Sequence, residues 1–313
     1  MTIQDCIAFL QQHDRFLILS HVRPDGDTLG SAGALCSALR RAGKTACMFP
    51  NPEITEKYLP YVQDYLAPED YRYETVISVD TAEEGMFPKG YEGPTPELAI
   101  DHHGSNSGYA PLRIVRPECA ACGEIILEVI EALNGGLSKE EADLLYIAVT
   151  TDTGCFQYMN TDANTLRAAA KLVDYGAENG LLNNIFFRSI PRSRILLESM
   201  VYQQMRFFRE GKIAFAVITQ SMIDASGVTE NDMDDLANLA SRPEGVIVSV
   251  TVKEKSSTEC KISMRSKPEV NVSDICAHFG GGGHAMAAGC KIEADGETAV
   301  ERILAVINEV WPE

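Results

Sequence analysis

The chain has 313 residues, of which 45% are hydrophobic and 23% charged, and its 45 acidic and 27 basic residues give a formal net charge of −18. Length and composition are typical of a soluble globular protein with one large hydrophobic core or, as we expect here, two. The negative charge excludes capture of long nucleic acid by a general basic field, because such binding needs many Lys and Arg contacts with phosphates. No apolar run approaches the roughly 18 residues of a membrane span.

The first residues, "MTIQDCIAFLQQHD", lack the basic region with which a secretory signal peptide begins, so we expect a cytoplasmic protein. The nine cysteines are scattered and odd in number, which favours a reducing compartment. Cys119 and Cys122 have the spacing of a redox or zinc motif. Zinc would need a second pair at similar spacing, so incidental thiols at a helix start are the favoured interpretation.

Strand-like and helix-like segments alternate over the first half of the chain. Short apolar runs predict strands at 15–21, 44–49, 73–80 and 97–103, and periodic patterns predict helices at 28–43, 119–134, 138–151 and 161–176. This alternation predicts an α/β fold with a mainly parallel sheet and helices on both faces.

The pattern changes near residue 190. A basic, partly amphipathic segment predicts a linker helix over 188–210, followed by strands at 212–219, 244–255 and 259–266, a Gly cluster and a last helix at 297–309. We therefore expect a first domain over 1–187, the linker helix over 188–210, and a smaller α+β domain over 211–313.

Acidic and imidazole side chains follow several of these apolar elements at their carboxyl ends. They are His21, Asp25 and Asp27 in "SHVRPDGD", Asp80 in "TVISVD", Asp101, His102 and His103 in "LAIDHH", and Asp152 in "LLYIAVTTD". In an open parallel sheet the carboxyl ends of the strands meet at one crevice, so we expect these side chains to lie together.

Carboxylates gathered in this way repel one another unless cations hold them. Oxygen ligands mixed with imidazoles suit Mn²⁺, and Mg²⁺ less well. The donors exceed what one ion needs, so two ions that share a bridging carboxylate are expected. A single Asp after a strand is usually a helix cap or turn former, and the prediction therefore depends on the joint pattern.

Four of these segments resemble the motifs of the DHH phosphoesterase family: "SHVRPDGDTLGSA", "VISVD", "AIDHH" and "TTDTGCFQY". Farther along, "RS" at 265–266 and "FGGGGHAMAAG" resemble the family's DHHA1 substrate-binding domain. Size and layout are most similar to the stand-alone bacterial enzymes that degrade very short RNA and dephosphorylate 3′-phosphoadenosine 5′-phosphate (pAp).

The resemblance implies a role for each residue of the first domain. One Mn²⁺ would be held by His21, Asp25 and Asp80, and the other by Asp27, Asp80, His102 and Asp152, with Asp80 bridging. Mg²⁺ or another divalent ion is the alternative. As catalytic residues, His103 would face the scissile phosphate, and Asp101 would orient the neighbouring histidines.

In the second domain the resemblance implies a substrate-binding set made of Arg265, Ser266, Gly281, Gly282, Gly283 and His284. Glycines let backbone amides approach an anion closely, and Arg265 can bind a phosphate through two hydrogen bonds. A Gly run by itself is equally typical of a flexible hinge. One departure from related sequences precedes Glu124, where Ala121, Cys122 and Gly123 replace hydroxyl residues. This helix start is expected to bind an anion or a neighbour differently.

The expected function is a metal-dependent phosphodiesterase and phosphomonoesterase, which degrades short oligoribonucleotides to mononucleotides and removes the 3′-phosphate of pAp. Its partners would be these small substrates, without long duplex nucleic acid or membrane, and a homodimer is left open. Two alternatives remain: a phosphodiesterase for cyclic di-AMP or linear pApA, and a nucleotide sensor without catalysis. The full ligand set argues against the sensor, because a protein that only binds a nucleotide does not need a complete set of metal ligands.

Overall fold

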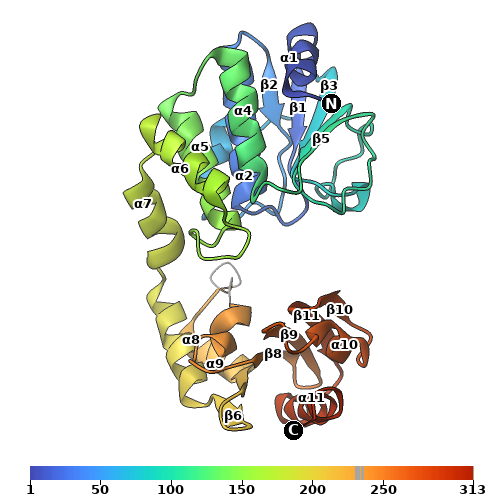
Figure 1. The fold of residues 1–313 in the computed structure, drawn as a ribbon, viewed down its shortest axis with the longest axis vertical. Coiled ribbons are helices and arrows are strands. Elements are labelled where there is room, and N and C mark those ends of the chain that lie inside the picture. The colour runs from blue at the N-terminus through green and yellow to red at the C-terminus, as the bar shows by residue number, and fades with distance from the viewer. Residues whose placement is uncertain (230–232, 234–235, 313) are drawn as a thin grey trace. The chain divides into compact units, whose positions relative to one another are not determined.

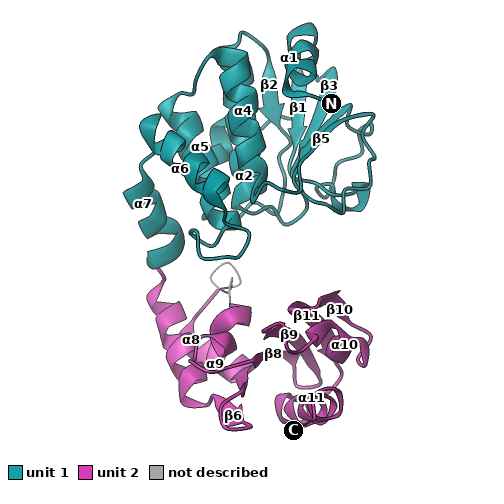
Figure 2. Cartoon of the chain, in the orientation of Figure 1, with its two compact units in different colours: residues 1–189 teal, residues 190–313 magenta. Residues whose placement is uncertain are grey.

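The computed structural model describes residues 1–229, 233 and 236–312. The chain divides into two compact units, Met1–Ser189 and Ile190–Glu313 (Figure 1, Figure 2). Each unit has its own hydrophobic core. Within the described part of the chain, no helix is both long enough and apolar enough to cross a membrane.

Unit 1 is built on a sheet of five parallel strands in the order β2-β1-β3-β4-β5. The strands are β1 (Phe16–Leu19), β2 (Ala46–Met48), β3 (Thr75–Val79), β4 (Leu98–Asp101) and β5 (Leu112–Val115). The α-helices are α1 (Ile3–Gln12), α2 (Gly26–Arg41), α3 (Leu59–Val62), α4 (Cys122–Asn134), α5 (Lys139–Asp152), α6 (Ala163–Asp174) and α7 (Asn179–Asn183). The other helical segments are the 3₁₀ turns η1 (Gln63–Tyr65) and η2 (Glu84–Met86) and the π-helix η3 (Asn184–Arg188).

The central strands of this sheet are buried along their whole length, which explains their almost continuously apolar sequences. On one face, Phe16, Ile18 and Ile77 join the core formed with the α-helices. The expected parallel sheet flanked by helices is thereby confirmed, although the long helices lie on one face and not on both as the sequence predicts. The long helices lie on that face, whereas Leu17, Leu19 and Val76 on the other face are covered by side chains from segments between strands, namely Phe49, Ala67, Tyr71, Phe87 and Tyr91.

Two glycines of α2 allow this helix to pack closely on α5. A Cβ atom at Gly26 would lie 2.3 Å from Oγ1 of Thr151, and one at Gly30 would lie 2.3 Å from the backbone oxygen of Leu144. Both distances are far below van der Waals contact, so only glycine fits. The close packing brings the beginning of α2 next to the end of α5, where the carboxylates of the two helices meet.

Unit 2 has a six-stranded mixed sheet in the order β10-β11-β9-β8-β7-β6. The strands are β6 (Arg206–Phe208), β7 (Ile213–Ile218), β8 (Val248–Ser256), β9 (Glu259–Ser266), β10 (Gly282–His284) and β11 (Ala287–Ile292). The helices are α8 (Arg192–Gln203), α9 (Gln220–Ser226), α10 (Val272–Ala277) and α11 (Gly296–Val310), with a 3₁₀ segment η5 (Leu236–Ser241). One face packs on α10 and α11, and the other packs on α8, α9 and η5 along β7 and β8.

The helix predicted over 188–210 is shorter in the structure, where α8 spans Arg192–Gln203. Pro191 precedes it with an extended backbone at φ −61° and ψ 151°. A proline disfavours helical geometry in the residue before it, so the helix begins after Ile190 and Pro191. At the other end, residues 206–208 form β6 and pair with β7.

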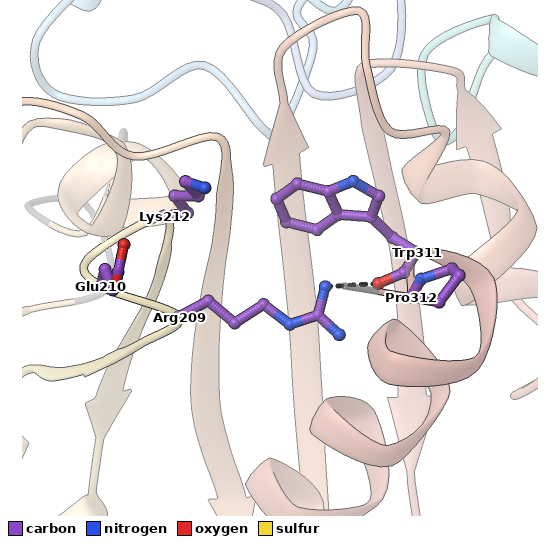
Figure 3. A pocket seen from close by; sticks show the side chains of 5 residues that line it. All are labelled: Arg209, Glu210, Lys212, Trp311 and Pro312. Carbon is purple, nitrogen blue, oxygen red and sulfur yellow. Dashed lines mark hydrogen bonds between the residues drawn. The ribbon is translucent and has the colours of Figure 1, made fainter.

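Arg209, in the turn after β6, holds the end of α11 (Figure 3). Its guanidinium donates hydrogen bonds to the backbone oxygen of Trp311 and, at 2.6 Å, to Oδ1 of Asn308. The guanidinium carbon also lies 5.1 Å from the centre of the indole ring. The pocket between Arg209, Lys212 and Trp311 is therefore lined by residues that fix the end of α11 to the turn after β6. Trp311 is the single tryptophan of the chain, and its fluorescence therefore reports on unit 2.

We expect Gly30→Ala to lower the free energy of unfolding of unit 1 by about 1–3 kcal/mol, since the added methyl group would overlap the backbone of α5. Gly180→Ala is the matched control, because nothing lies within 4 Å of a Cβ atom at that helical position. The control should leave stability unchanged or raise it slightly. Urea unfolding followed by far-UV circular dichroism measures both variants, and equal midpoints would contradict the packing argument.

Candidate active site

The structure brings together the six residues named as metal ligands, at the carboxyl ends of β1 and β3, after β4 and at the end of α5. Three sets each place their ligand atoms within 4.8 Å of one another: His21 with Asp25 and Asp80, Asp27 with His102 and Asp152, and Asp80 with His102 and His103. Asp80 belongs to two sets and His102 to two, so the sets form one continuous cluster.

The distances between the imidazole nitrogens and the carboxylate oxygens of this cluster are longer than ordinary hydrogen bonds, and they suit atoms that bind the same metal ion. Nε2 of His102 lies 3.4 Å from Oδ1 of Asp80 and 3.5 Å from Oδ2 of Asp152. Nε2 of His21 lies 3.6 Å from the other oxygen of Asp80. Two atoms that each lie about 2.1 Å from one divalent ion are about 3–4 Å apart. The two oxygens of Asp80 thus face different imidazoles, which is the arrangement of a bridging carboxylate.

Asp80 provides the test of whether the donors fit a cation. Its side chain is 3% exposed, and Oδ1 has no hydrogen-bond partner among the residues that the structure describes. Its backbone is left-handed at φ 54°, which is an uncommon conformation for a residue with a side chain. A buried carboxylate oxygen without a partner is costly, and a divalent cation between these side chains would satisfy it. The donors present therefore fit a metal site.

Backbone carbonyls orient the two ligand-type histidines. Nδ1 of His21 lies 2.7 Å from the oxygen of Val22, and Nδ1 of His102 lies 3.1 Å from the oxygen of Cys119. A carbonyl can only accept, so each Nδ1 carries the hydrogen, and Nε2 faces the carboxylates. The backbone thus presents both imidazoles in the tautomer that binds a cation through Nε2.

Asp101 is fully buried and contacts one of the two histidines that the sequence predicts it to orient. Oδ1 of Asp101 lies 2.8 Å from Nδ1 of His103 and accepts a hydrogen bond from that residue's backbone nitrogen. Asn106 donates to Oδ2 of Asp101 at 2.7 Å. Asn106 was not predicted as a site residue, although an amide side chain in the loop "DHHGSN", close to Asp101, could have indicated it. The chain Asn106–Asp101–His103 fixes the imidazole of His103 from behind.

Clustered negative charge shifts the protonation of the site. Burial alone lowers the pKa of His102, but the facing carboxylate of Asp80 and the charges of Asp27 and Asp152 raise it to about 10. In the same way, Asp25 and Asp80 outweigh burial and raise the pKa of His21 to about 9. Burial, followed by repulsion from other carboxylates, raises the pKa of Asp152 to about 7 and that of Asp27 well above its ordinary value. The site thus attracts positive charge strongly.

Asp27, which lies in α2, also caps the N-terminus of α4. Ala121, the N-cap residue of α4, has no side chain for this purpose. Instead, Oδ2 of Asp27 accepts from the backbone nitrogen of Cys122 at 2.6 Å, and Oδ1 accepts from that of Gly123 at 2.9 Å. The helix start without a hydroxyl residue therefore binds a neighbouring carboxylate. The thiol of Cys122 is buried and donates to the oxygen of Ile100, and both Cys119 and Cys122 are free.

The residues predicted to bind substrate gather at one edge of the unit 2 sheet. Arg265 on β9 pairs with Ala287 on β11, which pairs with His284 on β10, so Arg265 and His284 share a row and a face. Ser266 follows on the opposite face, where its hydroxyl donates to the oxygen of Val270 at 2.6 Å.

The glycines of this edge make its strand pairing possible. A Cβ atom at Gly281 would lie 2.3 Å from the oxygen of Gly289, and one at Gly283 would lie 2.6 Å from the oxygen of Ala287. Gly283 also has φ +147°, and Gly282 between them is open to solvent. The glycine run is thus an ordered strand rather than a hinge.

Comparison with known proteins agrees with these two parts. The model of the DHH family N-terminal domain matches residues 15–149, and the model of the DHHA1 domain matches residues 210–311. A bifunctional oligoribonuclease and PAP phosphatase NrnA of Thermus thermophilus is 33% identical over 93% of this chain and 89% of its own. The chain belongs to the DHH family.

A second relative in the DHH family, the protein of the same name from Bacillus subtilis, is 27% identical over 99% of this chain and 98% of its own. The crystal structure of an exopolyphosphatase-related protein from Bacteroides fragilis shares the fold, with a TM-score of 0.87 at 22% identity over 98% of this chain and 95% of its own. DHH phosphoesterases are metal-dependent, and this chain is accordingly a hydrolase of phosphoester bonds with acidic and histidine clusters suited to metal.

We expect Asp27→Ala to lower the free energy of unfolding of unit 1 by about 1–3 kcal/mol in a chelating buffer, because two backbone N–H groups at the start of α4 would lose their acceptor. Asp152→Ala is the matched control. It removes a carboxylate from the same cluster, but that side chain is 29% exposed and faces His102. Chemical unfolding of both variants measures the difference. The helix-capping role is wrong if Asp27→Ala is as stable as Asp152→Ala.

Proposed function

We propose that this protein is a Mn²⁺-dependent phosphoesterase that removes mononucleotides from oligoribonucleotides a few units long and the 3′-phosphate from pAp. The observation that carries the proposal is the position of Asp80, whose two oxygens face His21 and His102 in two adjoining ligand sets. The substrates are proposed from the names of the relatives in Thermus thermophilus and Bacillus subtilis.

In this proposal, His21, Asp25 and Asp80 would hold one Mn²⁺, and Asp27, Asp80, His102 and Asp152 would hold the other. When bound, such ions supply an activated water molecule and neutralise the phosphoryl oxygens. Asp25 has a second task, because it caps α2 by accepting hydrogen bonds from the backbone of Asp27 and Thr28. The start of α2 is therefore anchored by the same carboxylate that would bind the metal.

His103 is proposed to hold the scissile phosphate. Hydrogen bonding to Asp101, partly opposed by burial, raises the pKa of His103, which favours the protonated imidazole. With Nδ1 held by Asp101, the remaining nitrogen can donate to an anionic oxygen. Asp101 acts through His103 and is thus a positioning residue, and Asn106 supports it from the other side.

We assign catalysis and metal binding to residues 1–187, and substrate binding to residues 211–313, with 188–210 as the connection. Arg265, His284 and the glycines at 281–283 would bind the part of the substrate away from the reacting phosphate, with Ser266 bracing their strand. A chain with a net charge of −18 gains little from nucleotides beyond the first few, which supports short substrates. We also propose that the protein is located in the cytoplasm.

A substrate panel tests this function. With Mn²⁺ present, we expect turnover of RNA dinucleotides and pAp to exceed that of a 24-mer at equal molarity, and EDTA to abolish it. Readdition of Mn²⁺ should restore more activity than Mg²⁺, because Mg²⁺ accepts imidazole ligands poorly. Cyclic di-AMP and pApA belong in the same panel. Higher kcat/KM on either would shift the assignment to that substrate, binding without turnover would indicate a sensor, and full activity in EDTA would exclude the metal mechanism.

The division of labour between the units generates a second prediction. Arg265→Ala should remove a charge-assisted contact of about 1.5–3 kcal/mol and lower kcat/KM for dinucleotides and pAp about ten- to a hundredfold. His284→Ala should act in the same direction. Hydrolysis of a small chromogenic phosphodiester, which has no second phosphate, should stay close to that of the unmodified protein.

Arg302→Ala is the matched control, since it removes an exposed arginine from α11 of the same unit. It should leave kcat/KM for both substrate types unchanged, and metal content should be equal in all variants. If Arg265→Ala impaired the chromogenic ester as strongly as the dinucleotide, Arg265 would belong to the catalytic centre.

A further inference from the structure

One face of the unit 2 sheet is polar along β9 and β11. Side chains alternate on these strands: Ile262, Met264 and Cys290 enter the core beneath α10 and α11, and the residues between them lie on the opposite face. We call this opposite surface the polar face. It consists of Ser249, Thr251 and Lys253 on β8, Glu259, Lys261, Ser263 and Arg265 on β9, Gly282 and His284 on β10, and Ala287, Gly289 and Lys291 on β11. The 3₁₀ segment η5 packs on the β8 part of this face, where Thr251 donates hydrogen bonds to its backbone.

Three lysines form a row across the polar face. Lys253 pairs with Lys261, and Lys261 pairs with Lys291, so ammonium groups stand on neighbouring strands about 4.8 Å apart at the backbone. Like charges directly opposite one another destabilise a sheet. Lys291 forms a long ion pair with Glu259 of the same face, at 3.9 Å, and Lys261 is exposed. This concentration of positive charge stands out in a chain with 45 acidic residues.

A second row, with Arg265 as its charged member, lies four residues along the same strands. It contains Arg265, Ala287 and His284 in direct register. Four strand residues span about 13 Å. On β9, β10 and β11 the described surface between the rows carries only Ser263, Gly289 and Gly282, because the larger side chains of these strands point to the other face, and Thr251 of the adjoining β8 lies under η5. Nothing bulky on β9, β11 or β10 therefore obstructs a ligand that extends from one row to the other.

We propose that the lysine row is a second phosphate-binding site, which receives one backbone phosphate of an oligoribonucleotide of three or four units while another phosphate of the same strand binds Arg265. The inference rests on the proposed function and extends it to the substrate's length. Two positively charged rows separated by a strip of small residues can bind a flexible oligoribonucleotide, whose phosphates are evenly spaced. The strip lacks the apolar side chains that a protein partner or a membrane surface would use.

The two rows also set an upper limit to the benefit of length. Each lysine that meets a phosphate releases counterions, so its contribution falls as the salt concentration rises. Beyond the lysine row the strands end, β8 and β9 within a few residues and β11 at Ile292. Nucleotides past that point meet a chain of net charge −18. Affinity should rise from two to four nucleotides and then level off.

The test compares Lys261→Gln/Lys291→Gln with the unmodified holoenzyme on an RNA dinucleotide and a tetranucleotide. We expect the ratio of kcat/KM for the tetranucleotide to that for the dinucleotide to fall at least fivefold in the double variant. The dependence of log kcat/KM for the tetranucleotide on log salt concentration should become shallower by about 0.7 for each lysine removed. Each single variant should show an intermediate change.

Lys212→Gln is the matched control, because Lys212 is an exposed lysine in the turn before β7, away from the polar face. It should leave both the ratio and the salt dependence unchanged, and the fluorescence of Trp311 checks that every variant is folded. An unchanged ratio in the double variant would overturn the lysine site, as would equal losses on both substrates. If the unmodified enzyme hydrolysed neither RNA, the proposed function itself would fail.

Discussion

Repulsion among the clustered carboxylates is the constraint on which the rest of unit 1 depends. Asp27 and Asp80 are buried beside the half-exposed Asp25 and the partly exposed Asp152. The fold compensates part of this charge with the histidines, whose pKa values rise to about 9 in His21 and about 10 in His102. It compensates another part with the N-terminus of α4, whose backbone amides bind Asp27. Oδ1 of Asp80 is left for a cation.

This charge could not be assembled without the packing of the surrounding helices. Glycines at 26 and 30 let α2 lie against the backbone of α5, and Gly123 lets α4 approach, since a Cβ there would lie 2.7 Å from Cβ of Ala148. Three helix ends thus meet where the parallel strands finish. The stability of the hydrophobic layer holds the repelling groups in place, and the left-handed backbone of Asp80 is one visible cost of that arrangement.

The sequence predicts the parts of this fold whose signal is local. Short apolar runs predicted β1, β3 and β4, and the acidic and histidine residues that follow these runs predicted the position of the metal ligands. Short or partly exposed segments were missed: β5, where Leu112 and Arg113 are exposed, has little apolar pattern. Helix α1 was also missed, although Thr2 and Asp5 form a capping box before its apolar face. The proline at 191 was the available signal that the linker helix begins late.

The relations that escaped prediction are those between residues distant in sequence. Capping of α4 by Asp27 joins positions 95 residues apart, and the covering of Leu17 by aromatic side chains depends on loops without periodic pattern. The lysine row is of the same kind, because positions 253, 261 and 291 become neighbours only through strand register. A net charge of −18 therefore says little about any single surface. Strand register, rather than the total charge of the chain, decides which lysines become neighbours on one face of the sheet.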